Sequence, residues 1–346
     1  MNKEKTKLVY LQVLRGIAAL LVCFFHFRNF FKFPENWGQT LFGNGRIGVP
    51  MFFIISGFIM AYTTKHLSGN KLADVKTFLL KRIIRILPLY VILTIGFVIL
   101  QYEVGYHIKS NFWDVIQAFL FIPNNSYPPL YVGWTLNYEM FFYLIFGLCL
   151  IFGNKRHYAF LVSIIILLIV IPLATKGFVN FNQHKGYNYI SPIMSLITSH
   201  LIWQFGLGVA FAYLLPKLTI NFTARCILLV LSVILFSFHY FIYFDFYQSD
   251  LVFCGLLVGS IVLFDFSGIN LKAPGFLVFL GNISYSLYLV HPLFLISLPF
   301  YFLRNEWIES ETMVFFVMIP IYIVAAAISY ELIEKRLTNM IKRIVF

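Results

Sequence analysis

Charged side chains are scarce in this sequence. Lysine, arginine, aspartate and glutamate make up 12% of the 346 residues, about half of the roughly 25% that is usual in soluble domains. Hydrophobic residues make up 60% and aromatic residues 19%. This composition excludes a water-soluble globular protein and indicates an integral membrane protein.

Cysteines and long polar stretches are also lacking. Cys23, Cys149, Cys226 and Cys254 each stand alone in apolar surroundings, without a CxxC pair or metal-ligand spacing. We interpret them as small apolar residues and expect no metal site. No polar stretch is long enough for a soluble domain, and no internal repeat is visible. We therefore expect a single transmembrane domain over residues 1–346 with no appended soluble domain.

Long apolar runs, in contrast, are abundant. A run of about 20 apolar residues spans a hydrocarbon core about 30 Å thick. Such runs predict an all-α polytopic bundle of about ten helices, within a range of nine to eleven, at residues 8–31, 47–63, 83–101, 129–152, 157–175, 194–215, 226–243, 249–265, 275–301 and 312–333. The segment from Phe112 to Ile122 is expected to be a short interfacial or re-entrant piece.

Lysine and arginine are unevenly distributed between the two sides of this bundle. With an internal N-terminus, 18 of them fall in inner segments and seven in outer ones. The inner set is Lys3, Lys5, Lys7, Lys65, Lys71, Lys76, Lys81, Arg82, Arg85, Lys155, Arg156, Lys217, Arg225, Lys272, Lys335, Arg336, Lys342 and Arg343, and the outer set is Arg28, Lys32, Arg46, Lys109, Lys176, Lys185 and Arg304. Because cytoplasmic loops retain basic residues, both termini are predicted to be cytoplasmic. The net charge of +12 follows mostly from this bias and gives little support to nucleic-acid binding.

The first apolar run contains two ionisable residues, Arg15 and His26, in the stretch LQVLRGIAALLVCFFHF. Ionisable groups at membrane depth are costly and indicate function by default. Arg15 and His26 are eleven residues apart. In an α-helix this interval brings the two side chains to within about 20° of the same face, about 16 Å apart along the axis. Both side chains are therefore expected to line one interior stripe. A neutral His26 there can act as a general base, although an interhelical hydrogen bond is the simpler role.

A basic cluster leads straight into the third predicted helix, in the stretch FLLKRIIRILPLY. Lys81, Arg82 and Arg85 form this cluster, and Arg82 and Arg85 share one helical face. Two guanidinium groups on one face suit phosphate recognition, whereas a topology signal or a contact with anionic lipid is the alternative.

The fourth predicted helix contains a carboxylate near mid-membrane, in the stretch GWTLNYEMFFYL. This residue, Glu139, must be protonated, paired or facing a polar cavity. Its predicted partners are Arg15, His26 or an arginine of the basic cluster, and a purely structural ion pair stays open. Tyr143 shares its face by the i, i+4 relation.

Polar tips also enter a late helix, in the stretch GNISYSLYLVHPL. Ser284, Tyr288 and His291 share a stripe there and are expected to face the bundle interior, for hydrogen bonding or for chemistry. In the second predicted helix, Ser56 beside Gly57 is interpreted as a small residue that permits close packing. A nucleophilic Ser56 would need a base within reach.

Taken in this order, the motifs resemble the membrane-bound acyltransferase 3 family. They are the arginine and histidine of the first helix, GVPMFFIISGF, the RxxR pair before a proline and tyrosine, WTLNYEMFFY, and SYSLYLVHP. The amino-acid sequences of the first and fourth segments are most similar to the ExoZ-like branch of exopolysaccharide O-acetyltransferases. The resemblance extends from Leu11 to about Arg336.

The resemblance implies an O-acetyltransferase that moves acetyl from acetyl-CoA to a hydroxyl of a carbohydrate. It implies catalytic roles for His26, Arg15 and Glu139, and donor binding by Arg82 and Arg85, with Lys81 and Arg15 beside the donor. Supporting roles fall to Tyr143, Trp134, Ser284, Tyr288 and His291. His26 would act as base towards the acceptor hydroxyl, or would carry the acetyl group transiently.

The resemblance also implies an exopolysaccharide, lipid-linked or cell-wall glycan as acceptor, and a multi-pass location in the bacterial cytoplasmic (inner) membrane, in contact with lipid. The main alternative is a multi-helix transporter or exporter that uses Arg15, His26 and Glu139 as a proton or substrate path. The absence of matched half-sequences disfavours it.

Overall fold

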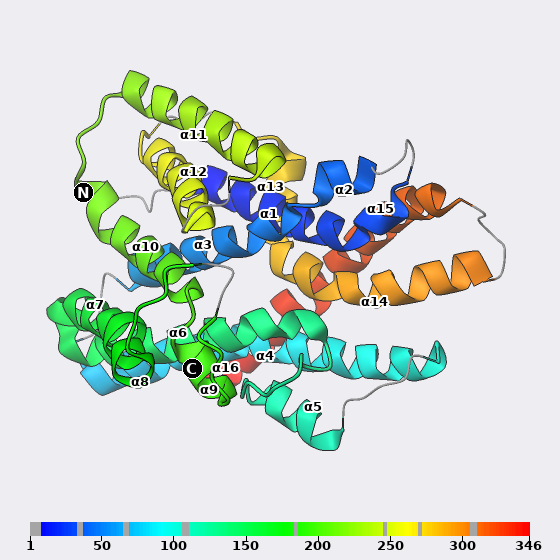
Figure 1. Ribbon diagram of the computed structural model, residues 1–346, viewed down its shortest axis with the longest axis horizontal. Coiled ribbons are helices and arrows are strands. Elements are labelled where there is room, and N and C mark those ends of the chain that lie inside the picture. The colour runs from blue at the N-terminus through cyan, green and yellow to red at the C-terminus, as the bar shows by residue number, and fades with distance from the viewer. Residues whose placement is uncertain are drawn as a thin grey trace.

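The computed structural model describes residues 8–32, 37–64, 69–105, 111–182, 186–244, 248–268, 272–304 and 310–346. In these ranges the ordered elements are helices, and no strand occurs (Figure 1). Several basic residues used to predict orientation lie outside the described residues, namely Lys3, Lys5, Lys7, Lys65, Lys109 and Lys185. The all-helical prediction is confirmed.

Sixteen α-helices follow one another along the described chain. They are α1 (Val9–Phe27), α2 (Trp37–Phe42), α3 (Gly48–Thr63), α4 (Lys71–Glu103), α5 (Phe112–Phe119), α6 (Trp134–Cys149), α7 (Arg156–Ile165), α8 (Ile171–Lys176), α9 (Pro192–Ile197), α10 (Leu201–Leu214), α11 (Phe222–Ile242), α12 (Ser249–Asp265), α13 (Gly275–Asn282), α14 (Ser284–Arg304), α15 (Glu311–Ser329) and α16 (Thr338–Val345). Two π-helical segments, Ile166–Val170 and Tyr330–Leu337, continue α7 into α8 and α15 into α16.

Eight helical runs in the described residues are long and apolar enough to cross a membrane. One of them, Tyr131–Lys176, covers the two predicted segments 129–152 and 157–175. Gly153 separates these segments, since its φ of 57° and ψ of −119° interrupt the helix between α6 and α7. The predicted segment 249–265 forms α12, a helix of 17 residues that is not among the eight. The short piece expected near Phe112 is α5, an eight-residue helix. Asn111 and Asp114 form a capping box at its N-terminus.

The predicted start of the third helix is wrong. We expected this helix at residues 83–101, whereas α4 begins at Lys71, where the Asn70 side chain accepts a hydrogen bond from the Ala73 amide at 3.2 Å. The first turns of α4 are polar but contain good helix formers, so the helix extends beyond its apolar part. The basic cluster of Lys81, Arg82 and Arg85 therefore lies in the interior of α4 and not at the start of the helix.

Close backbone packing holds the centre of the bundle together. A Cβ atom at Gly208 of α10 would lie 2.0 Å from the Ile54 carbonyl oxygen of α3, and one at Gly57 would lie 2.3 Å from the Phe205 carbonyl oxygen. The rings of Phe142 and Phe205 stack with centroids 3.8 Å apart. Small residues at helix contacts provide the van der Waals packing that drives helix association in lipid.

The start of α1 is fixed by a carboxylate of another helix. Asp265, at the end of α12, accepts hydrogen bonds from the Tyr10 amide at 3.0 Å and the Leu11 amide at 2.9 Å. These amides would otherwise be orphans of a helix N-terminus, where negative charge is favoured. The contact sets the depth of Arg15, which follows about one turn later.

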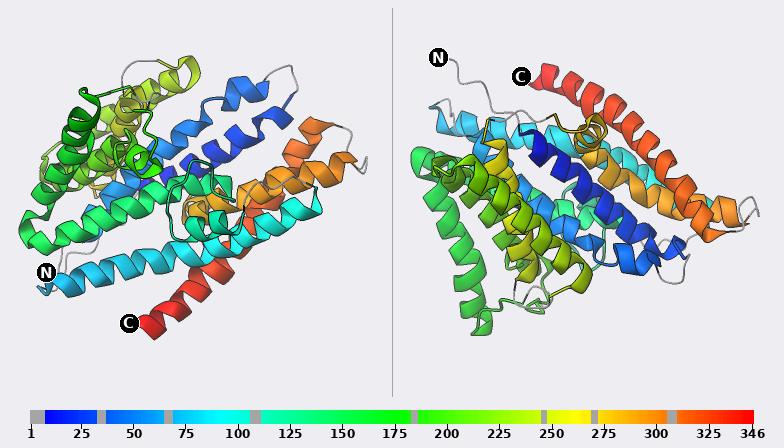
Figure 2. Two further views of the ribbon diagram at one scale, coloured as in Figure 1. Left: turned by 60° about the horizontal axis from the view of Figure 1, so that its bottom comes forward. Right: turned by 90° about the horizontal axis from the view of Figure 1, so that it is seen from above.

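The two ends of the described chain lie at the same end of the bundle (Figure 2). The run from α15 to α16 crosses α4, with which it is in contact. The Lys81 ammonium group lies 5.6 Å from the centroid of the Phe346 ring. This arrangement agrees with termini on one side of the membrane.

Candidate active site

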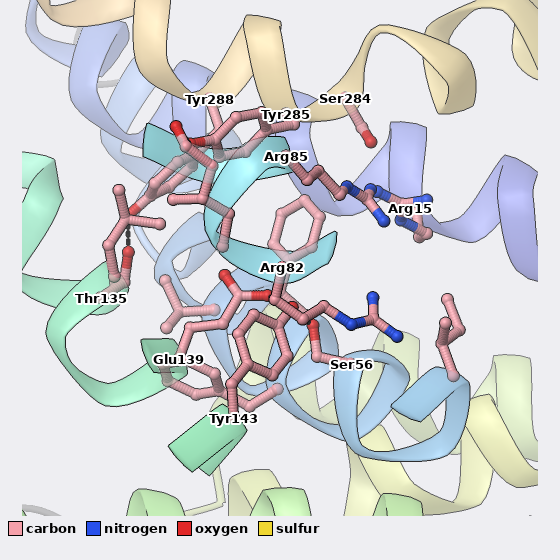
Figure 3. Close-up of a pocket in the computed structure, with 16 residues that line it drawn as sticks. Arg15, Ser56, Arg82, Arg85, Thr135, Glu139, Tyr143, Ser284, Tyr285 and Tyr288 are labelled. Atoms are coloured by element: carbon pink, nitrogen blue, oxygen red, sulfur yellow. Dashed lines mark hydrogen bonds between the residues drawn. The ribbon is translucent and has the colours of Figure 1, made fainter. Parts of the chain in front are cut away.

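A cavity opens between α1, α3, α4, α6 and α14 (Figure 3). Most of its wall is apolar, and its polar side chains are Arg15, Ser56, Arg82, Arg85, Thr135, Glu139, Tyr143, Ser284, Tyr285 and Tyr288. Ionisable residues at membrane depth face the bundle interior, as expected for costly groups in lipid.

Three arginines contribute positive charge to this cavity. Figure 3 shows the guanidinium groups of Arg15 and Arg85 directed toward one another. Arg15 donates to Gln12 Oε1 at 3.2 Å. Arg82 donates to Thr63 Oγ1 at 3.3 Å, and its guanidinium lies 5.2 Å from the centroid of the Tyr143 ring. Neighbouring guanidinium groups repel, so the site is suited to an anionic ligand.

Glu139 is held by hydroxyl groups. Its Oε1 accepts a hydrogen bond from Ser56 Oγ at 3.2 Å and another from the Tyr143 hydroxyl. Among the described residues no arginine lies within ion-pair distance of Glu139, although Arg15, Arg82 and Arg85 interact with it electrostatically. Ser56, interpreted from the sequence as a packing residue, therefore contributes its hydroxyl to the site.

A second carboxylate near the arginines, Glu334, was missed in the sequence. Its Oε2 accepts from Ser286 Oγ at 2.9 Å, and it interacts electrostatically with Arg15 and Arg85. Glu334 precedes Lys335 in a polar stretch that is typical of an exposed segment on the cytoplasmic side of a membrane protein. The one signal for it is structural, because it lies in a π-helical segment, a feature frequent at functional sites.

A second cavity adjoins the first at the arginines. Ile59, Arg82 and Arg85 line both cavities. The second cavity, here called the basic cavity, also contains Lys81 and Lys342. Lys342 belongs to α16, which is in contact with α4. The four cations are offset by one acidic lining residue among those described, Asp74.

Two histidines form a contact beside the first cavity. The Nδ1 atom of His26 lies 2.9 Å from the Val22 carbonyl oxygen and 3.2 Å from His291 Nε2. The Nδ1 atom of His291 lies 2.7 Å from the Tyr288 carbonyl oxygen. Carbonyl oxygens only accept, so the neutral rings must both carry their proton on Nδ1. His26 Nε2 is then left with a lone pair.

His26 does not line the cavity that contains Arg15, although we expected one stripe for both. The cavity ends near the histidines at Tyr288, whose hydroxyl lies 2.9 Å from Thr135 Oγ1 and donates to the Val132 carbonyl oxygen at 3.1 Å. The rings of Tyr288 and His291 have centroids 5.9 Å apart. The histidine pair is therefore adjacent to the cavity through Tyr288.

The remaining predicted residues divide between these regions. Ser284 lines the first cavity, is fully buried, and has an Oγ atom without a hydrogen-bond partner. Trp134 lines neither cavity and packs against Tyr138 with ring centroids 5.8 Å apart. Thus Arg15, Arg82, Arg85, Glu139, Tyr143, Ser284 and Tyr288 meet in one cavity, Lys81 lies in the basic cavity, and His26 and His291 meet behind Tyr288.

Comparison with known proteins gives consistent matches. The profile of a family described as an acyltransferase domain matches residues 8–331. A protein of Acidianus two-tailed virus that is named as an acetyltransferase is 27% identical over 290 residues, which are 80% of each chain. A protein of Staphylococcus aureus (strain COL) named as an O-acetyltransferase is 26% identical over 370 residues, which cover 93% of this chain and 56% of that relative.

A third relative bears the name exopolysaccharide production protein ExoZ and comes from Rhizobium meliloti (strain 1021). It is 33% identical over 125 residues, which are 34% of this chain and 38% of the relative. No solved structure matches.

Proposed function

Because the chain belongs to the acyltransferase family whose profile spans residues 8–331, we propose that it transfers an acetyl group from acetyl-CoA to a hydroxyl of a cell-envelope carbohydrate. Family membership and the apolar helices make it a multi-pass membrane acyltransferase. Family membership also favours an enzyme over the transporter alternative. Beyond family membership, we propose the identity of the acyl donor, of the catalytic base and of the acceptor.

The observation that carries the proposal is the shared wall of the two cavities. Arg82 and Arg85 line both the basic cavity and the first cavity, between α1, α3, α4, α6 and α14, which we call the membrane cavity. Coenzyme A carries a diphosphate and a ribose phosphate at one end and a long, uncharged pantetheine arm at the other. The phosphates would bind in the basic cavity, with Lys81 and Lys342, where guanidinium and ammonium groups replace water. The arm would extend past Arg85 into the membrane cavity.

Polar groups along this cavity suit a pantetheine arm. Ser284 Oγ is buried without a partner, and a buried hydroxyl without a partner is destabilising. An oxygen of the donor would accept a hydrogen bond from it. Arg15 would neutralise negative charge at the entrance to the cavity, together with Arg85. The thioester would reach the Tyr288 end of the cavity, next to the histidine pair.

His26 is proposed as the general base. Its Nδ1 proton is directed to Val22 and His291, so Nε2 is the atom that can take a proton from the acceptor. The acceptor oxygen would attack the thioester carbonyl carbon as Nε2 removes its proton. The tetrahedral intermediate would then expel the CoA thiolate, which recovers that proton from the imidazolium. The products are an acetyl ester and free CoA.

The proposed acceptor is a neutral or acidic glycan of the exopolysaccharide or cell-wall type. The support is the name of the Rhizobium relative, which concerns exopolysaccharide production. The bacterial cytoplasmic membrane is the corresponding location, with the basic cavity facing the cytoplasm, where acetyl-CoA is available. The positive-inside distribution of lysine and arginine supports this orientation.

The test is transfer of radiolabel from [acetyl-¹⁴C]acetyl-CoA into envelope polysaccharide by membranes that contain the protein. We expect label with the wild type and with Arg336→Ala, whose side chain is 70% exposed. We expect little label with Arg82→Ala combined with Arg85→Ala at equal protein levels. Equal labelling by the double variant would contradict the donor assignment. Absence of label with the wild type, with donors and acceptors present, would contradict the function.

A further inference from the structure

A polar cavity that the proposed chemistry does not use lies near the start of α6. Side chains from three parts of the chain line it: α6, the segment between α8 and α9, and the junction of α9 with α10. We call it the loop cavity. Its lining includes the amide and hydroxyl side chains of Tyr138, Asn182, Tyr187, Asn188, Thr198 and Ser199.

The loop cavity lies away from the donor. Tyr138 precedes Leu150, which lines the basic cavity, by 12 residues, or about 18 Å along a helix. Tyr138 is also close to the proposed reaction site. It follows Thr135 by less than one helical turn, and the centroids of the Tyr138 and Phe53 rings lie 6.3 Å apart. Thr135 and Phe53 both line the membrane cavity. The loop cavity is therefore on the acceptor side of the proposed reaction site.

The chemistry of the lining indicates the class of ligand. Among the described residues that line it there is no lysine, arginine, aspartate or glutamate, and His200 is the single ionisable group besides tyrosines. Amides and hydroxyls can both donate to and accept from the hydroxyls of a ligand. Tyrosine rings offer an apolar face and a polar tip. An uncharged, polyhydroxylated ligand satisfies this lining, and the described lining residues offer a phosphate or a carboxylate no lysine or arginine.

Two tyrosines of the lining make hydrogen bonds, one within the segment between α8 and α9 and one to α8. The Asn180 amide donates to the Tyr187 hydroxyl at 2.6 Å, and the Tyr189 hydroxyl lies 2.5 Å from Thr175 Oγ1. Asn188 adopts a φ of 50°, a conformation that is uncommon for a residue other than glycine. The cavity volume is about 350 Å³, and ligand sites commonly measure about 300–1,000 Å³.

We propose that the loop cavity binds a neutral sugar unit of the acceptor chain, next to the unit that is acetylated. This inference rests on the proposed carbohydrate acceptor. It makes the enzyme selective for an oligosaccharide over a single sugar, because a single sugar at the reaction site would not extend into the loop cavity.

The test uses the full-length protein in detergent micelles and neutral oligosaccharides of one to six units prepared from the host's envelope polysaccharide. The variant combines Asn182→Ala with Asn188→Gly, which removes both amides while glycine readily adopts a positive φ at position 188. The control is Ile190→Ala, on the same loop, 96% exposed and not part of the cavity lining.

We expect the double variant to raise the KM for the longer oligosaccharides about tenfold, the change given by loss of one or two hydrogen bonds. The KM for acetyl-CoA and the KM for a single sugar should stay within about twofold of the wild type. An unchanged KM for the oligosaccharides, or an equal rise for a single sugar, would overturn the inference.

Saturation-transfer NMR of the same oligosaccharides with His26→Ala separates the two proposals. Binding that depends on Asn182 and Asn188, without any transfer by the wild-type protein, would support the loop cavity and contradict the proposed function. Stronger binding of acidic oligosaccharides than of neutral ones would contradict the ligand class.

Discussion

His26 and His291 are separated by 265 residues in the sequence, yet their ring nitrogens Nδ1 and Nε2 lie 3.2 Å apart. His291 is fully buried and donates from Nδ1 to the Tyr288 carbonyl oxygen. It therefore presents an acceptor to His26 and favours the tautomer of His26 in which Nε2 is free. In this arrangement His291 is a positioning residue for the proposed base.

Replacement of His291 tests this role. His291→Phe removes the acceptor and should lower kcat for acetyl transfer by about 10- to 100-fold, the range found for groups that orient metal-binding imidazoles. His291→Gln retains an oxygen that can accept from Nδ1 and should keep more activity than His291→Phe. Thermal unfolding in detergent checks that both variants are folded. Equal kcat values for two folded variants would argue against the positioning role.

The arginines should recognise the phosphates of the donor and not its acetyl group. With acetyl-CoA, Arg85→Ala should raise the donor KM by about tenfold or more, because a charge-assisted hydrogen bond is worth about 1.5–3 kcal/mol. With acetylpantetheine, which has no phosphate, the wild type and Arg85→Ala should react at the same low rate. A comparison of kcat/KM for the two donors measures this difference. A similar loss with both donors would place Arg85 at the reacting group instead.

Glu334 should stabilise the folded protein as a counter-charge for Arg15 and Arg85. Glu334→Ala leaves these guanidinium groups less compensated and removes the acceptor of Ser286. We expect a loss of about 1–3 kcal/mol in unfolding free energy, measured as a lower midpoint of thermal unfolding. Binding of acetyl-CoA should restore part of that midpoint, since its phosphates supply negative charge. A midpoint equal to that of the wild type would contradict this role.

The contact between α3 and α10 should tolerate no added volume. Gly208→Ala places a Cβ atom 2.0 Å from the Ile54 carbonyl oxygen, so we expect a destabilisation of about 1–3 kcal/mol from overpacking. Gly96→Ala is the matched control, because a Cβ there meets its nearest neighbour, Leu293, at 3.8 Å. The readout is the fraction of each variant that remains monodisperse after heating. Equal loss in both variants would show that the helix contact adapts.

Membrane depth explains how much of the site could be predicted from the sequence. Arg15 and Glu139 are costly in lipid, so their inward orientation follows from composition and position alone. The pairing of His26 with His291 could not be predicted, because it depends on which helices become neighbours. That choice is made by backbone packing at small residues such as Gly16, where a Cβ atom would lie 2.7 Å from the Gly281 amide nitrogen shortly before α14, and hydropathy does not reveal such packing. Glu334 was missed for a different reason: its neighbours are those of a surface segment.

The proposed role of His26 is tested most directly by acetyl transfer from labelled acetyl-CoA with His26→Ala and His157→Ala in parallel. His157 packs against Tyr213 with ring centroids 4.7 Å apart and lies outside both the membrane cavity and the basic cavity. We predict that His157→Ala transfers label to polysaccharide at the wild-type rate, and that His26→Ala binds acetyl-CoA but transfers none. Transfer by His26→Ala at a rate near that of the wild type would contradict the role of His26 as the general base.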